Sequence, residues 1–342
     1  MALTRRDFLI AVPLVTGAIM ACSDKHSGAS RSAYSEIRAT GDSNPNAKTI
    51  LVFMPQTEQT NDVWSGLSDE LPRNIRAVAV RVESAADVPI IEEAMTRHKP
   101  AGVVLMNNPT VAAYREFQRL HVGNRFPPAV IVMTSFLENP SSQAANATGI
   151  SYEIPLLMLM SDLRKVLALS AERVGVVVRP SLLRFITQQI ELARREQILV
   201  SVERVSSSPR PAEIKLALRR LKQRVDVIWV LNDDQLLTPR LITKGWLPGL
   251  DERPRVPTIV GVASLVSPQH SFGTFAVLPD HVALGMQAAG LLLDIAAANW
   301  SLDHWYAVQL PRSTTTAIDL AQIRERFTLK QHALEQVDKI LE

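Results

Sequence analysis

The feature that most constrains the fold is a regular alternation of short apolar runs with longer helical segments, which begins at Thr49. The runs have the length of strands and are rich in β-branched residues. Several are apolar throughout, as expected when both faces of a sheet are covered. This repeated βα unit predicts an α/β fold, with parallel sheets and helices on both faces. The expected strands of the first half are Thr49–Met54, Ala77–Val82, Gly102–Asn107 and Ala129–Ser135.

The alternation restarts in the second half of the chain, after an expected helix at Ile154–Ser170. A second series of strand-length runs follows, and an apolar helix at Asp280–Ala298 comes after it. The expected strands of this series are Arg173–Val178, Leu199–Val205, Val225–Leu231, Pro257–Val262 and Gly273–Leu278. Two such series, in a chain of this length, predict two doubly wound parallel-sheet lobes.

The N-terminus has the layout of an export signal. Two adjacent arginines precede an apolar run at Phe8–Ala21, which is shorter than the ~20 apolar residues needed to cross a bilayer. The motif TRRDFL at Thr4–Leu9 resembles the twin-arginine export motif. Ile19–Cys22 resembles a lipobox, in which cleavage precedes a cysteine that carries lipid. We therefore expect residues 1–21 to be removed and Cys22 to be lipidated. The alternative is a buried cysteine at the end of a core helix.

Cys22 is the only cysteine among the 342 residues, so an intramolecular disulfide is not possible. Residues 22–46 are rich in Ser, Ala, Asn and Gly and have little apolar periodicity, which predicts a flexible tether. The expected location is therefore outside the cytoplasm, with a lipid anchor at the periplasmic side of a bacterial membrane.

Several classes of chemistry are not indicated by the sequence. The formal net charge of +3 is spread along the chain without a basic stripe among aromatic residues, which argues against a nucleic-acid partner. There is no Walker loop, no GxGxxG after a strand and no GxSxG elbow. The histidines are dispersed and lack the spacing of metal ligands. We therefore expect no enzymatic activity, no cofactor and no metal.

Polar residues follow the expected strands, at the ends where open parallel sheets bind ligands. As a set they suit a cleft between two polar rims, although each one alone is also a common helix cap. The candidate ligand-binding residues are Gln56, Thr57, Asn107, Asn108, Thr110, Ser135, Asn232, Asp233, Asp234 and Ser264. Asp233, with Asp234 in reserve, is the expected partner of a ligand's ammonium group, because adjacent side chains diverge. The alternative is that Asp233 caps a helix that begins near Gln235.

Four stretches of the chain resemble the TrpX-like ABC transporter substrate-binding proteins, which are type-I periplasmic binding proteins. The stretches are NATGISYEIPLLMLMSDLRKVLALSAERVGVVVRPS, VDVIWVLNDDQLLTP, SFGTFAVLPDHVALGMQAAGLLLDI and TAIDLAQIRERFTLKQHALEQVDKIL. The resemblance implies two lobes that are joined by three crossovers and close on a small ligand. It places lobe 1 at residues 47–149 plus 275–304 and lobe 2 at residues 150–274 plus 305–342. It also implies that the chain ends in a last helix and a tail.

Two functions follow from these observations. The first is a lipid-anchored solute-binding protein of an ABC-type importer, which binds a small polar ligand, for example an amino acid, and works with an ABC permease. The second is a sensory or scaffolding lipoprotein of the same fold that acts on a membrane sensor protein. The loops at Met106–Thr110 and Thr134–Pro140 depart from the family pattern and favour the second function. The resemblance in the second half of the chain favours the first.

Overall fold

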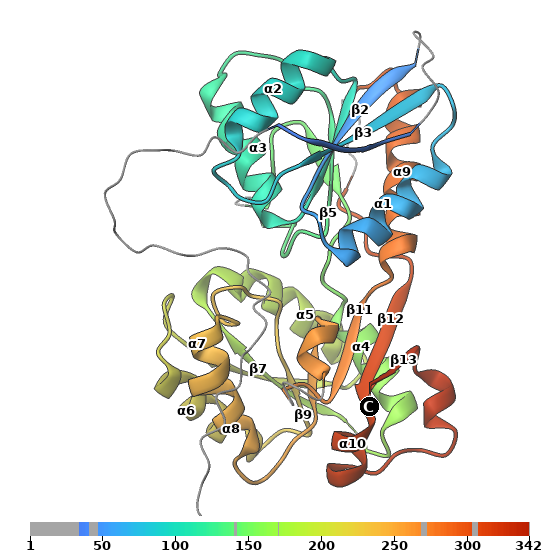
Figure 1. Cartoon of the computed structure of the whole chain (residues 1–342). Helices are drawn as coiled ribbons and strands as arrows, with labels where there is room; N and C mark the ends of the chain where they lie inside the picture. The colour runs from blue at the N-terminus through green and yellow to red at the C-terminus, as the bar shows by residue number, and fades with distance from the viewer. Residues whose placement is uncertain are drawn as a thin grey trace, which may run out of the picture.

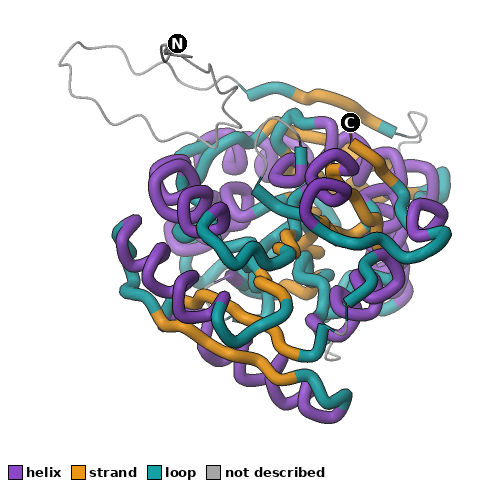
Figure 2. The backbone as a smooth tube through the Cα atoms, turned by 90° about the horizontal axis from the view of Figure 1, so that it is seen from below, coloured by secondary structure: helices purple, strands orange, loops and turns teal. Residues whose placement is uncertain are grey.

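The computed structural model of the protein describes residues 34–40, 47–139, 142–169, 171–267, 272–302 and 307–341. The expected export signal, its cleavage site and Cys22 lie outside these residues. The described chain forms two lobes, one above the other, each built on a mainly parallel sheet (Figure 1). Seen from the free end of the second lobe, helices lie on both sides of the strands (Figure 2). The predicted α/β fold class is confirmed.

The first lobe contains a six-stranded sheet with the order β1-β3-β2-β4-β5-β6. Its strands are β1 (Glu36–Ala39), β2 (Lys48–Met54), β3 (Ile75–Arg81), β4 (Gly102–Met106), β5 (Ala129–Val132) and β6 (Ala147–Gly149). Neighbouring strands are parallel except β1 with β3. The helices between them are α1 (Glu58–Glu70), α2 (Val88–His98) and α3 (Asn108–Leu120). Because β2 alternates its side chains, Ile50 and Val52 pack toward α1, whereas Leu51 and Phe53 pack toward α2 and α3.

The second lobe contains a seven-stranded sheet with the order β13-β12-β11-β10-β9-β7-β8. Its strands are β7 (Arg173–Val178), β8 (Leu199–Arg204), β9 (Val227–Trp229), β10 (Thr258–Val260), β11 (Phe275–Pro279), β12 (Thr314–Asp319) and β13 (Lys339–Leu341). Only β11 and β12 pair antiparallel among these strands. Its α-helices are α4 (Leu156–Val166), α5 (Leu183–Arg195), α6 (Pro211–Lys222), α7 (Pro239–Leu241), α8 (Leu247–Asp251) and α10 (Leu320–Arg326).

The two sheets share one strand order. Apart from the added edge strands, β3-β2-β4-β5-β6 in the first lobe matches β8-β7-β9-β10-β11 in the second. In each sheet the order therefore reverses between two neighbouring strands, which are β2 and β4 in one lobe and β7 and β9 in the other. Open α/β sheets bind ligands at such a reversal, beyond the carboxyl ends of the strands. A ligand-binding site is therefore expected in the loops that follow these strands.

Helix α9 (His281–Ala297) belongs to the first lobe and packs against α1. A Cβ on Gly285 would lie 2.1 Å from the carbonyl oxygen of Val63, so glycine permits this close approach. The strand that precedes α9 lies in the second sheet, where Phe275–Pro279 pairs with β10 and β12. The sequence assignment of these strand residues to lobe 1 is therefore wrong. The chain crosses to the first lobe after Pro279, one element later than expected.

Part of the expected tether is a strand instead. Glu36–Ala39 forms β1 and extends the first sheet as its antiparallel edge. Tyr34 holds this segment in place: its hydroxyl donates a hydrogen bond of 2.7 Å to Glu36, and it lies 2.8 Å from Nε2 of His98. The guanidinium carbon of Arg97 lies 4.5 Å from the centre of the Tyr34 ring. A few specific contacts therefore order a segment whose composition alone indicates flexibility.

The sequence also did not predict the three strands β6, β12 and β13. β6 has only three residues, too few for an alternation pattern to identify it. The expected last helix is largely replaced by β12, the short helix α10 and β13. β12 pairs with β11, and its run of threonines followed by Ala317 and Ile318 suits a strand that is buried toward its end.

Candidate functional site

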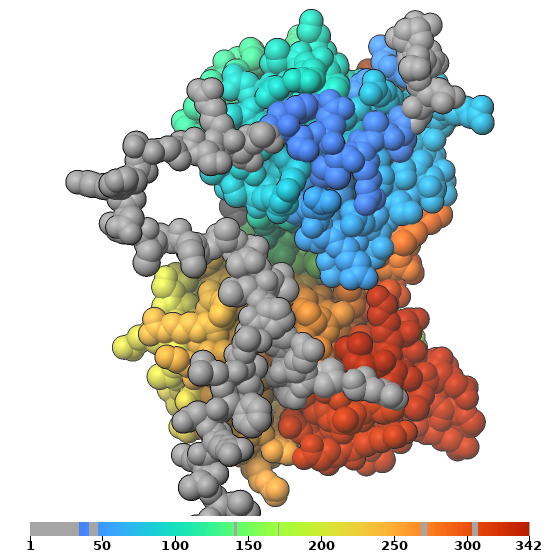
Figure 3. All heavy atoms as spheres, in the orientation of Figure 1, coloured from blue at the N-terminus to red at the C-terminus, as the bar shows by residue number. Residues whose placement is uncertain are grey.

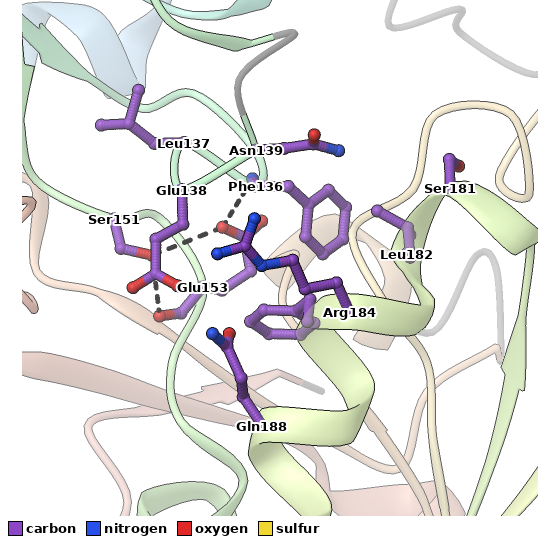
Figure 4. A pocket seen from close by; sticks show the side chains of 11 residues that line it. Phe136, Leu137, Glu138, Asn139, Ser151, Glu153, Ser181, Leu182, Arg184 and Gln188 are labelled. Carbon is purple, nitrogen blue, oxygen red and sulfur yellow. Dashed lines mark hydrogen bonds between the residues drawn. The ribbon is translucent and has the colours of Figure 1, made fainter.

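A cavity lies between the lobes, at the carboxyl ends of β5 and β7 (Figure 4). The first lobe contributes the loop Phe136–Asn139, and the second contributes the start of α5 around Arg184 and Gln188. Ser151 and Glu153, in the crossover from β6 to α4, form its inner side. Its volume is about 70 Å³. In the space-filling view the blue and teal first lobe lies above the gold and red second lobe (Figure 3).

Glu153 is the most unusual residue of this cavity, because it is buried and only partly hydrogen-bonded. Its Oε2 accepts a bond of 2.7 Å from the Phe136 amide and one of 3.5 Å from the Ser151 hydroxyl. Its Oε1 is buried and has no hydrogen-bond partner among the described residues. Burial raises the pKa of Glu153 to about 7, because a low-dielectric environment disfavours the charged carboxylate. The site therefore holds an acceptor that a donor or cation can complete.

Two aromatic rings line the same cavity, one from each lobe. Phe136 and Phe185 meet edge to face, with ring centres 5.3 Å apart and planes at 73°. Phe136 has a φ of +54°, which is uncommon for a bulky residue, and its amide is fixed by Glu153. Strain of this kind persists only where the surroundings hold it. The loop after β5 is thus held in one conformation by the same carboxylate that faces the cavity.

Arg184 supplies the positive charge of the cavity. It is exposed on α5, and in Figure 4 its guanidinium extends from the helix toward the side where Glu153 and Ser151 lie. Gln188, one turn further along α5, adds an amide to the rim. The cavity therefore combines a buried carboxylate, an exposed guanidinium and an aromatic wall, which suits a ligand with both charges and an apolar part.

Asp233 is already paired within the protein, whereas the sequence led us to expect it as the partner of a ligand's ammonium group. Nε and Nη2 of Arg179 each donate a hydrogen bond of 2.7 Å to its carboxylate, which is almost completely buried. Its Oδ1 also accepts a bond of 3.0 Å from the Gln235 amide. This pair joins the ends of β7 and β9, where the strand order reverses. Because Arg179 already neutralises it, Asp233 acts as a structural anchor there. The expected helix near Gln235 is a turn instead, and α7 begins at Pro239 with Thr238 as its cap. Asp234 beside Asp233 is exposed.

The other candidates lie at strand ends as expected, but several are used as caps. Thr57 forms a capping box with Thr60 at the start of α1, and Asn107 accepts from the Thr110 amide at the start of α3. Asn108 accepts a bond of 3.0 Å from the Ser135 amide and so ties two neighbouring loops together. Gln56, Thr57, Asn108, Asp234 and Ser264 are exposed, Asn107, Ser135 and Asn232 are half-buried, and Thr110 and Asp233 are buried.

Asn232 has the closest connection to the cavity among these candidates. It lines a second, smaller space of about 20 Å³, which Glu153 and Trp229 also line. Its Oδ1 is buried without a partner in the described part of the chain. Glycine at position 261 makes room for it, because a Cβ there would lie 2.3 Å from the Asn232 amide nitrogen. Two partnerless acceptor oxygens, on Asn232 and Glu153, thus belong to side chains that border one small space.

Within the described ranges, no helix is long and apolar enough to cross a membrane. Nor do these residues contain a group of three or more His, Cys, Asp or Glu side chains that could hold a metal ion.

Several solved structures share this fold. An ABC domain in complex with L-Trp from Streptococcus pneumonia aligns at a TM-score of 0.55 and 14% identity, covering 86% of this chain and 100% of that one. A ligand-free, open substrate-binding protein with adhesive properties from Clostridium difficile aligns at a TM-score of 0.60 and 12% identity, covering 86% and 99%. A conserved domain protein from Vibrio cholerae aligns at 0.54 and 15%, covering 86% and 99%.

These similarities establish the type-I periplasmic-binding-protein fold for this chain. No family model matches the sequence, and no curated protein matches it.

None of the candidate residues from the sequence lines the inter-lobe cavity itself. Glu153 follows β6, a strand too short to be recognised. The available signal was a lone acid between Tyr152 and Ile154 in the otherwise apolar stretch that leads into α4. Phe136 and Phe185 have the pattern of ordinary core residues, and only the approach of the two lobes brings them together.

Proposed function

We propose that this protein is an extracytoplasmic solute-binding protein, anchored by lipid at Cys22, that delivers a small amino-acid-like zwitterion to an ABC-type importer. The fold supports the binding class, and the residues of the inter-lobe cavity support the ligand class. The resemblance to TrpX-like proteins supports the same assignment.

The observation that carries this proposal is the partnerless Oε1 of buried Glu153. Asn232, beside the same small space, has a second partnerless acceptor oxygen. A group that satisfies both must donate at least two hydrogen bonds, and an ammonium group also neutralises the carboxylate. Glu153 therefore takes the role that the sequence analysis gave to Asp233.

The remaining parts of the ligand have matching partners. Arg184 is the guanidinium that can receive a carboxylate at the rim, and Phe136 with Phe185 forms an apolar wall. Gln56, Asn108 and Ser135 stay in the proposal as outer polar contacts on the first lobe. The cavity of about 70 Å³ accommodates a head group, whereas typical ligand sites measure roughly 300–1,000 Å³. The proposal therefore includes movement of the lobes about their crossovers on binding.

The test is a thermal-shift screen of the purified mature domain against L-amino acids, the corresponding amines and the corresponding acids, followed by calorimetry on the hits. Ligands that carry both charges should raise the melting temperature more than their amine or acid counterparts. Glu153→Gln keeps the side-chain shape and should weaken binding at least tenfold, which is about 1.4 kcal/mol. Glu138→Gln is the matched control, because Glu138 borders the same cavity but is exposed.

If a zwitterion binds and both glutamine variants retain wild-type affinity, Glu153 is not the ammonium partner. If no amino acid, amine or acid binds, the ligand class is wrong.

Export and anchoring are tested separately. Metabolic labelling with a palmitate analogue should mark the wild type and not Cys22→Ala. Replacing Arg5 and Arg6 with lysine should block delivery through the twin-arginine route. Equal labelling of both proteins, or unchanged delivery of the double variant, would remove the corresponding part of the proposal.

The sensory or scaffolding lipoprotein remains a second candidate, because Arg179 already occupies Asp233, the buried acid at the strand ends of the second lobe. A protein with a reduced site could signal without transport. Uptake of the radiolabelled ligand separates the two functions: deletion of the protein should abolish uptake if it serves an importer, and should leave uptake unchanged if it serves a sensor.

A further inference from the structure

A second, larger cavity lies in the second lobe, at the edge of the sheet opposite the inter-lobe cavity. It is bordered by Thr258 at the start of β10 and by Thr274 just before β11, which places it at the amino ends of these strands. Helices α8 and α10 form its sides, at the end of the lobe that points away from the first lobe (Figure 1). Its volume is about 420 Å³, within the range of small-molecule sites.

Two side chains that line this cavity each carry a hydrogen-bond donor with no partner among the described residues. The donors are Nε2 of Gln322 and Nε of Arg326, both on α10 and both shielded from solvent. Gln322 as a whole is only 6% exposed. Glu325 lies 3.9 Å from Nε of Arg326, too far for a hydrogen bond. An unsatisfied buried donor is costly, and here both open positions call for an acceptor.

The rest of the lining combines apolar side chains, the hydroxyls of Thr258 and Thr274, and an ion pair. Leu250, Phe272 and Phe327 border the cavity, and Arg255 stands at its rim. Asp251 also lines the cavity and pairs with Arg255 at 2.7 Å, so these two charges largely cancel. The lining thus places two partnerless donors, both on α10, beside an apolar wall.

We propose that this cavity binds a small organic acid, with its carboxylate on Gln322 and Arg326 and its apolar body against Leu250, Phe272 and Phe327. The partnerless groups here are donors, whereas those beside the inter-lobe cavity are acceptors. The two sites therefore take different chemistry, and this inference does not depend on the proposed function. A ligand here would sit far from the cleft, on the free end of the second lobe.

The experiment titrates the mature domain with octanoate by calorimetry, with octanol and octylamine as head-group controls. Octanoate should bind, and octanol and octylamine should bind at least tenfold more weakly. Gln322→Leu and Arg326→Leu should each weaken octanoate binding at least tenfold. Gln322→Leu should not lower the melting temperature, because it replaces an unsatisfied buried donor with an apolar group.

Arg324→Leu is the matched control, since Arg324 is exposed on the same helix and should leave octanoate binding unchanged. Glu153→Gln should also leave it unchanged, which separates this site from the cleft. The proposal is overturned if octanoate does not bind at millimolar concentration. It is also overturned if octanol binds equally well, or if Gln322→Leu and Arg326→Leu bind octanoate like the wild type. Binding that is lost in Glu153→Gln would place the acid in the cleft and overturn it too.

Discussion

Two buried carboxylates lie near the inter-lobe cleft, and they differ in their hydrogen-bond partners. Asp233 receives two bonds from Arg179 and one from a backbone amide, so its charge is matched within the protein. Glu153 receives bonds on one oxygen only, and its other oxygen is left without a partner. Burial alone therefore does not identify a ligand contact. The residue that can receive a ligand is the one whose own structure leaves a position open.

The largest expected effect comes from breaking the matched pair. Arg179→Ala leaves the Asp233 carboxylate buried and unpaired, which should lower the free energy of unfolding by about 3–5 kcal/mol. Urea unfolding monitored by circular dichroism measures this. Arg173→Ala is the control, because Arg173 also forms a two-point pair, with Asp226, but its side chain is 54% exposed. A loss in Arg173→Ala as large as that in Arg179→Ala would show that burial does not set the difference.

The next effect concerns the open carboxylate and its proton. The pKa of Glu153 is raised to about 7 in the folded protein, above its value of 4.5 without the fold, so the folded state binds the extra proton between these values. Stability from this group is therefore present below pH 4.5 and is lost as the pH rises to about 7, by roughly 3 kcal/mol.

Glu153→Gln cannot titrate and should lack this loss. The measurement is the difference between the wild-type and Glu153→Gln unfolding free energies at pH 5 and pH 8. The free energy of unfolding of the variant should rise relative to that of the wild type as the pH rises. A difference that stays constant, or that moves in the opposite direction, would contradict the assignment of this pKa to Glu153.

A smaller effect is expected on ligand affinity. An ammonium group pairs with the ionised form of Glu153, so affinity for a zwitterion should rise with pH up to about 7 and then level off. Below pH 7 the dependence should approach tenfold per pH unit, which is about 1.4 kcal/mol. Calorimetry at several pH values checks this, with Glu153→Gln as the control that should show a flat profile. A wild-type affinity that does not change with pH would contradict the proposed pairing of the ammonium group with Glu153.

The smallest effect is expected at Asp234. It adjoins Asp233 in sequence but is exposed, so Asp234→Asn should change stability by no more than about 0.5 kcal/mol and leave affinity unchanged. Melting curves and calorimetry test both. Weaker ligand binding by Asp234→Asn would mean that the second lobe contributes an acid to the site after all.

The comparison also explains which parts of the site were predictable. The βα pattern correctly places Thr57, Asn107 and Asp233 after strands, because each strand ends where its apolar run ends. Their partners are not visible in the pattern. Arg179 and Asp233 are far apart in the chain, and only the pairing of β7 with β9 brings them together. The sequence identified possible ligand contacts, whereas long-range pairing decided which were already occupied.

By itself, the sequence determined the two series of βα units and therefore the two-lobed α/β architecture, because the apolar periodicity of strands and helices is local. It also determined the candidate export and lipidation motifs near Cys22, which lie outside the described residues. The tertiary structure decided that β11 belongs to the second sheet and that Glu36–Ala39 forms an edge strand. It decided as well that Glu153 faces a cavity between the lobes. These outcomes depend on hydrogen-bond partners and packing surfaces distant in the chain, which no local pattern contains.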